Sequence, residues 1–219
     1  MDRHTLFRVL AAVLAGIAVS ASDAATPPAS EGLVAVQSRS LDEIYVRPNA
    51  NLSAYRKIIV DPGQATLKKN WLKDINSQRD MTRWLVPEDA QRVQELATSS
   101  LAPNIAEGFR QQGYEVVAAA GPGVLRVTPR VSDLYLNAPD SHNPGIQRYF
   151  VRDGGQATLQ LEVRDAVSGQ LLGRVVDRGL AREIRLNNRA TDVSNLFWFE
   201  ALYREWASNS AKVFAEPQP

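Results

Sequence analysis

The stretch QATLQLEVRDAVSGQLLGRVV, residues 156–176, has the clearest structural pattern in the chain. Apolar and polar residues alternate along its first half, which is the period of a strand with one buried face. Ser168 and Gly169 then supply a turn, and a second strand begins at Leu171 and runs toward Asp177. The stretch therefore predicts an antiparallel strand pair in which one face is buried and the other is polar.

The register of this pair can also be predicted, because each strand has one apolar face. A register that places Leu161 opposite Val175 buries both side chains. The same register sets Glu162 opposite Arg174 on the outer face, where opposite charges favour pairing.

A third strand is predicted at residues 124–136, VLRVTPRVSDLYL. Pro129 has no N–H to donate to a ladder, so this strand either lies on an edge or carries a bulge. The apolar positions change from odd to even numbers between Val131 and Leu134, which favours a bulge there. The uninterrupted apolar run Ile58–Val60 predicts a further strand, covered on both faces.

Two long helices complete the predicted fold. Residues 87–113 have apolar side chains every four positions, and Pro103 within them must either kink the helix or divide it. Residues 191–214 have their large apolar side chains on one side of a helix. We expect an α+β fold: a mainly antiparallel sheet covered by two long helices in a single domain.

The N-terminal residues resemble a secretory signal peptide. A basic start with Arg3 and Arg8 precedes the apolar run Val9–Val19, and small-residue cleavage patterns end at Ala21 and Ala24. The run is shorter than the ~20 residues that span a bilayer, although a retained anchor is the alternative. We predict a signal peptide at residues 1–24, a flexible leader at 25–35 and the domain at 36–216, with the mature protein in the periplasm.

Composition excludes several classes of function. The 219 residues contain no cysteine, which removes a lipid anchor, disulfides and thiolate chemistry. Residues 1–24 hold two basic and two acidic residues, so the remainder keeps the net charge of +1. This near-neutral balance argues against nucleic acid or an anionic membrane as the main partner.

Four stretches together resemble an uncharacterised family of bacterial exported proteins and lipoproteins, a DUF3313-like domain of unknown function. They are LDEIYVRPNANLSAYRKIIVDP, LVPEDAQRV, GVLRVTPRVSDLYLNAPD and QATLQLEVRDAVSGQLLGRVVDR. Many members of that family carry a lipid anchor, whereas this sequence lacks the required cysteine, which implies a soluble periplasmic version. The resemblance implies no catalytic residues.

The first candidate site is the loop NAPDSHNPG, residues 137–145, where Asp140 and His142 lie two positions apart. A histidine beside a carboxylate can act as a general base or a metal ligand. The same composition is typical of an exposed loop, and no further catalytic or ligand residues accompany it. We therefore predict no catalytic residue, cofactor or metal.

The second candidate is the stretch at residues 67–86, in which basic residues surround Trp71 and Trp84. Connections of this length are often functional, and tryptophan is enriched at interfaces. Trp198 lies about 60° outside the apolar cluster of its helix and either covers the sheet edge or anchors a partner. We predict that Trp71, Trp84 and Trp198 are candidates for partner binding, and that docking on the core is the alternative.

We expect a non-catalytic periplasmic accessory or binding protein, with an envelope protein or cell-wall component as its partner. The alternative is a small-ligand or glycan-binding protein whose ligand lies between the sheet and the last helix. A hydrolase or metal-dependent enzyme that uses Asp140 and His142 is the least favoured hypothesis. The sequence does not indicate an oligomeric state.

Overall fold

The predicted strand pair lies at the centre of the sheet. The computed structural model describes residues 31–137, 153–182 and 192–216. Strand β7 (Asp153–Asp165) and strand β8 (Leu171–Arg182) are antiparallel. Leu161 pairs with Val175, and Glu162 pairs with Arg174, so the predicted register is confirmed.

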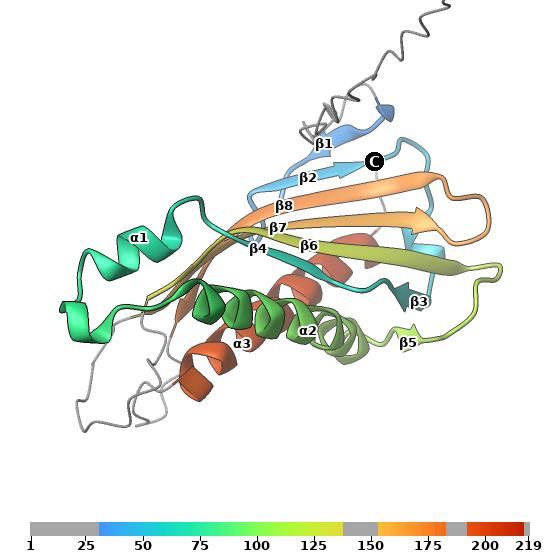
Figure 1. The fold of residues 1–219 in the computed structure, drawn as a ribbon. Coiled ribbons are helices and arrows are strands. Elements are labelled where there is room, and N and C mark those ends of the chain that lie inside the picture. The colour runs from blue at the N-terminus through green and yellow to red at the C-terminus, as the bar shows by residue number, and fades with distance from the viewer. Residues whose placement is uncertain (1–30, 138–152, 183–191, 217–219) are drawn as a thin grey trace, which may run out of the picture.

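The sheet has eight strands, which are distributed along the chain from Val34 to Arg182 (Figure 1). Its order is β1-β2-β8-β7-β6-β3-β5, and β4 pairs with β6 beside β3. The remaining strands are β1 (Val34–Val36), β2 (Glu43–Val46), β3 (Lys57–Val60), β4 (Gln64–Leu67), β5 (Glu115–Val116) and β6 (Val124–Leu136).

The prediction of a mainly antiparallel sheet is wrong, because the sheet is mixed. Strands β3 and β4 both run parallel to β6, and β5 runs parallel to β3. Parallel neighbours need a long crossover connection. Helix α2 (Pro87–Gln111) supplies it, because it links β4 to β5 and β6 across one face of the sheet.

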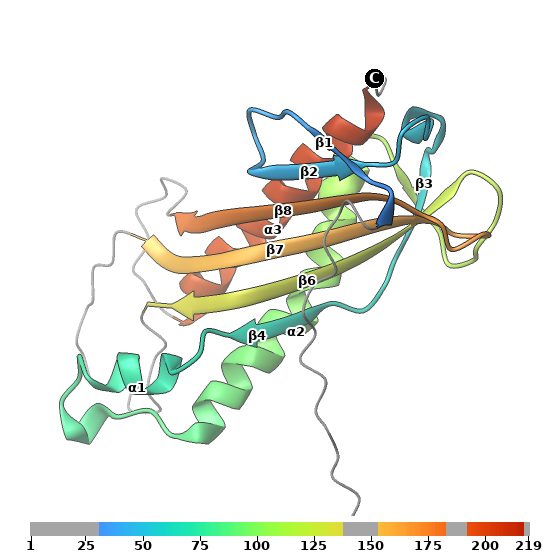
Figure 2. The same ribbon diagram turned by 90° about the horizontal axis from the view of Figure 1, so that it is seen from above.

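The prediction that two long helices cover the sheet is also wrong. Helix α2 and helix α3 (Asp192–Ala215) lie on the same face and contact each other there. Within the described residues no helix lies over the opposite face, which is turned toward the viewer in Figure 2. We call that uncovered side the open face.

Three short helical segments complete the described part of the chain. They are η2 (Leu52–Ala54), α1 (Trp71–Asn76) and η3 (Met81–Arg83). Pro103 lies inside α2 without dividing it, which decides between the two alternatives left by the sequence. No helix of the described ranges is long and apolar enough to cross a bilayer.

The bulge predicted in β6 is confirmed. The pairing of β6 with β7 shifts between Ser132 and Tyr135, and Asp133 has a left-handed φ of 51°. Gly155 of β7 pairs with Leu136 just beyond the bulge, and a Cβ atom there would be 1.8 Å from the carbonyl oxygen of Tyr135. Only glycine allows β7 to approach the bulge this closely.

Pro129 lies inside β6, at a position where one side of the strand has no partner. The carbonyl of Val127 accepts a hydrogen bond from the Asp61 N–H. The main-chain groups of every second residue of β6, Val127 and Pro129 among them, therefore point toward the side of the strand on which both β3 and β4 lie. The pairing with β3 ends at Val127, and the pairing with β4 begins at Arg130. The nitrogen of Pro129 therefore faces a gap between two partner strands, and no ladder bond is lost.

Candidate functional site

The open face presents the polar half of the alternating pattern in β7. Side chains on the other half are buried against the helices, among them Leu159, Leu161 and Val163. The open face takes from β7 the side chains of Gln156, Thr158, Gln160, Glu162 and Arg164. Polar side chains from β6 and β8 flank them by direct cross-strand pairing.

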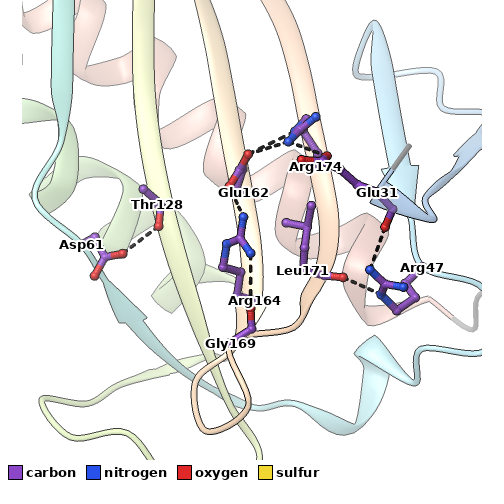
Figure 3. Close-up of polar contacts among 9 residues, drawn as sticks. All are labelled: Glu31, Arg47, Asp61, Thr128, Glu162, Arg164, Gly169, Leu171 and Arg174. Carbon is purple, nitrogen blue, oxygen red and sulfur yellow. Dashed lines mark hydrogen bonds and ion pairs between the residues drawn. The ribbon is translucent and has the colours of Figure 1, made fainter. Parts of the chain in front are cut away.

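A network of ion pairs crosses the central part of this face (Figure 3). One guanidinium nitrogen of Arg174 lies 2.7 Å from a carboxylate oxygen of Glu162 and 2.7 Å from one of Glu31. Arg164 reaches the second oxygen of Glu162 at 3.0 Å. The network therefore ties β7 and β8 to the segment that precedes β1.

The same segment is held a second time by Arg47. Its guanidinium donates to the main-chain oxygens of Glu31 at 2.8 Å and Leu171 at 2.7 Å (Figure 3). Strand β1 begins at Val34, within the residues that the sequence predicts as a flexible leader. These contacts attach the chain to the sheet from Glu31 onward, ahead of β1.

Burial and ion pairing act against each other at Glu162. Burial raises the pKa of its carboxyl group, but hydrogen bonds from Arg174 and Arg164 outweigh burial and hold the pKa below its ordinary value. A charged Glu162 is therefore part of the folded state. Both carboxylate oxygens interact with arginines, so Glu162 joins β7 to β8.

A second polar contact on the open face lies near the β3 end of the sheet. The hydroxyl of Thr128 donates to Asp61 at 2.7 Å (Figure 3). Arg126 lies 3.7 Å from the same carboxylate. The charges of this half of the face are thus largely engaged with one another.

The other half of the open face is hollowed. Two adjoining hollows, of about 460 Å³ and 310 Å³, share Lys68, Gln156 and Leu180 as lining residues. We treat them together as the polar hollow. Its lining includes Lys68, Gln78, Tyr135, Gln156, Arg178 and Leu180.

The polar hollow brings together four parts of the chain. The strands β6, β7 and β8 form its floor, where Tyr135 pairs with Gln156 and Gln156 pairs with Leu180. Lys68 follows β4 and lies 5.4 Å from the centre of the Tyr135 ring. Gln78, beyond α1, donates to the Tyr135 hydroxyl at 3.4 Å.

A buried carboxylate on the helix side of the sheet was not anticipated from the sequence. Asp177 accepts hydrogen bonds from the Trp206 indole at 2.6 Å and the Asp42 main chain at 2.7 Å. Burial raises the pKa of Asp177 despite these bonds, which favour its charged form. Both oxygens point into packed surroundings, so Asp177 joins β8, α3 and the chain before β2.

Two of the three tryptophans predicted as partner-binding candidates are buried. Trp71 is 1 % exposed, and its indole donates to the carbonyl of Leu136 at 3.1 Å. Trp198 is 5 % exposed and lies against Gly154, where a Cβ atom would be 2.5 Å from its ring. Trp84 is 51 % exposed, so the hypothesis of partner contact rests on Trp84.

The alternative of a ligand between the sheet and the last helix stays a prediction, but the two are in close contact at Gly179. A Cβ atom added to Gly179 of β8 would lie 2.6 Å from Leu202 and 2.7 Å from Trp206. Tyr203 and Trp206 of α3 are fully buried at this contact. The polar hollow lies on the opposite face of the sheet.

Asp140 and His142 lie outside the described residues. In the described part of the chain, no group of three or more His, Cys, Asp or Glu side chains could hold a metal ion. The residues of the polar hollow were not identified as a site, although Lys68 and Gln78 belong to the stretch at residues 67–86. Their assembly depends on the bulge and on parallel pairing, which local patterns do not specify.

Residues 23–210 match the family described as "Protein of unknown function (DUF3313)". No curated protein matches the chain. Among solved structures, the chain is similar to a PelC dodecamer from Paraburkholderia phytofirmans, with 10% identity, a TM-score of 0.35, and coverage of 80% of this chain and 98% of that one. It is also similar to a neuraminyllactose-binding hemagglutinin homologue from Helicobacter pylori, with 11% identity, a TM-score of 0.27, and coverage of 81% and 89%. Similarity at this level carries no argument about function.

Proposed function

The chain belongs to the DUF3313 family, whose function is unknown, and we propose that it is a non-catalytic accessory protein that binds another protein of the bacterial cell envelope. The exported location rests on the N-terminal sequence, where a basic start, a short apolar run and small residues follow in the order of a signal peptide. The binding role rests on an exposed apolar surface.

That surface is formed by Met81, Trp84 and Val86, which are 76 %, 51 % and 50 % exposed. We call these three side chains the 81–86 surface. The three lie within six consecutive residues; exposed large apolar side chains are typical of interaction sites when they form one patch, and tryptophan is among the residues that contribute most to binding. The exposure of Trp84 beside Met81 and Val86 is the observation that carries the proposal.

The surface is presented by an ordered segment. The side chain of Asn76 accepts a hydrogen bond from the Leu85 N–H at 2.8 Å and donates to the Leu85 carbonyl at 2.9 Å. Leu85 itself is buried, and the Trp84 indole donates to the Arg79 carbonyl at 3.3 Å. A segment held in this way loses little conformational freedom on binding, which favours affinity.

The charges around the surface favour a protein over a membrane. Asp80 and Glu88 are exposed beside it, and Arg83 lies between Met81 and Trp84. Charges of both signs around a small apolar centre are typical of a protein interface. A membrane-binding face carries an excess of Lys and Arg.

Site-specific photo-crosslinking in cells tests the proposal. A photoreactive residue is placed at position 84, and in a matched control at Val167, which is also strongly exposed but lies in the β7–β8 turn. We expect one crosslinked protein at position 84 and none at position 167. Trp84→Glu, with thermal unfolding unchanged, should abolish association of the tagged protein with that partner.

Equal crosslinking from the two positions, or none from either, would overturn the proposal. Crosslinks from position 84 to lipid or to cell-wall glycan alone would overturn the choice of a protein partner. Retention of the partner by Trp84→Glu would show that binding occurs elsewhere.

A further inference from the structure

Within the described residues, the lining of the polar hollow has a composition suited to a hydroxylated ligand. Amide and hydroxyl side chains line much of it, including Gln78, Asn137, Gln156 and Thr158. These groups both donate and accept hydrogen bonds, as sugar hydroxyls require. Asp74 lies at the α1 end of the hollow and adds a strong acceptor.

Two cations stand on opposite sides of the hollow. Lys68 lies beside β6, over the Tyr135 ring, and Arg178 lies two strands away on β8. Neither side chain has an ion-pair partner among the residues that the structure describes. Asp133 is the acidic residue in the same part of the lining, so cations outnumber acids there.

An anionic group would fit between these cations. Thr158 pairs directly with Arg178 across the strands, and Gln156 lies on the floor between Tyr135 and Leu180. A phosphate or carboxylate above Thr158 and Gln156 would receive neutral hydrogen bonds from the floor. Lys68 and Arg178 would add charge-assisted hydrogen bonds from the sides, which are the stronger kind.

The shape and chemistry do not favour a nucleotide. The aromatic ring in the lining, Tyr135, is half-buried with Lys68 above it and Gln78 bound to its hydroxyl. A base would need an open aromatic face to stack on. Leu180, 45 % exposed, offers instead a small apolar contact for the C–H face of a sugar ring.

We propose that the polar hollow binds an acidic saccharide, with its phosphate or carboxylate between Lys68 and Arg178 and its hydroxyls toward Gln78 and Asn137. This site is independent of the 81–86 surface, and either could fail without the other. Phosphorylated and uronic sugars share the required chemistry, and the probes below distinguish them.

The experiment is a titration of the ¹⁵N-labelled full chain followed by amide chemical shifts. The probes are tri-galacturonic acid, mannose 6-phosphate and neutral maltotriose. We expect saturable shifts of the Gln156 and Thr158 amides with one or both acidic probes, and binding of maltotriose weaker by about tenfold or more. The acidic probe that binds tighter identifies the source of the charge. Binding should weaken as salt is added.

The variants are Arg178→Gln and Lys68→Gln, each expected to weaken binding of the acidic probe by about tenfold. Arg126→Gln is the matched control, because Arg126 is an exposed arginine of the same face that lies near Asp61, outside the hollow. It should leave affinity unchanged. All three positions are exposed, and thermal unfolding checks that the variants fold.

Three outcomes would overturn the proposal. They are the absence of saturable shifts with either acidic probe, maltotriose binding as tight as that of the acids, and equal loss of affinity in Arg126→Gln and Arg178→Gln. The last would indicate attraction to the general charge of the face. Crosslinking from position 84 is unaffected by any of these results.

Discussion

At Glu162, the two hydrogen-bonded arginines outweigh the cost of burying a carboxylate. Its pKa is lowered in the folded state, because hydrogen bonds from Arg174 and Arg164 overcome the effect of burial. A lowered folded-state pKa means that the charged carboxylate stabilises the fold above the unfolded pKa of about 4.3. That stabilisation is lost as the pH falls through the lowered folded-state value.

Glu162→Gln should therefore lower the free energy of unfolding at pH 7 by about 1 kcal/mol, since it removes charge-assisted hydrogen bonds to two arginines. The difference from wild type should begin to shrink as the pH falls below about 4.3, where the carboxyl group of the unfolded chain takes up a proton, and it should vanish below the lowered pKa of the folded state. Urea unfolding at pH 7 and in the acid range measures both values. Glu95→Gln, at an exposed position of α2, is the matched control. A difference that does not change with pH would contradict the assigned ion pairs.

At the scale of elements, the contact between α2 and α3 depends on Gly108. A Cβ atom at this position would lie 2.5 Å from the Cβ of Ala207 and 2.5 Å from the main-chain oxygen of Arg204. The helices approach each other closely because both sides of the contact are small. Helix propensity and steric overlap have opposite effects on the stability of a variant with a larger residue at this position.

Alanine is favoured over glycine inside a helix by about 1 kcal/mol. At Gly108 the overlap with the backbone of α3 should cost about 1 to 3 kcal/mol, because a main-chain oxygen cannot move aside alone. We expect Gly108→Ala to lower the midpoint of urea unfolding, although the same change at an exposed helix position raises it. A stabilised variant would show that α2 and α3 can separate without loss.

At the scale of the whole molecule, the two N-terminal strands extend the sheet beside β8, the last strand in the sequence. Strand β2 pairs with β8, and the Asp42 carboxylate accepts the Arg178 N–H at 3.0 Å. Asp177 in turn holds Asp42 and the indole of Trp206. The N-terminal segment thus belongs to the folded unit from Glu31 onward, through its ion pair with Arg174.

A cleavage site well before Glu31 is consistent with this arrangement, because it leaves every described contact intact. We predict that the protein recovered from the periplasm begins at Ala25, after cleavage at Ala24. Mass spectrometry of the intact protein and N-terminal sequencing measure this. Recovery of the uncleaved chain in the membrane fraction would contradict the prediction and favour a retained anchor.

The sequence alone determined the features that depend on patterns among residues close together in the chain, namely the register of one strand pair, a bulge and the two long helices. Alternation along residues 156–176 set the β7–β8 register, because a slip by one position would expose an entire apolar face. The change of parity in β6 located the bulge near Asp133 for the same reason. The two long helices were predicted from their apolar periodicity.

Only the tertiary structure decided how distant segments meet. The parallel pairing of β3 and β4 with β6 joins residues more than sixty positions apart, and no local pattern specifies that partner. The burial of Trp71 and Trp198 likewise depends on which backbone lies beside each ring. The open face and the polar hollow follow from these choices: both helices lie on one side, so side chains from separate strands face solvent together on the other. Local alternation determines which face of the sheet a side chain occupies. Its neighbours on that face are determined by contacts between distant segments, whose formation must offset the loss of chain entropy.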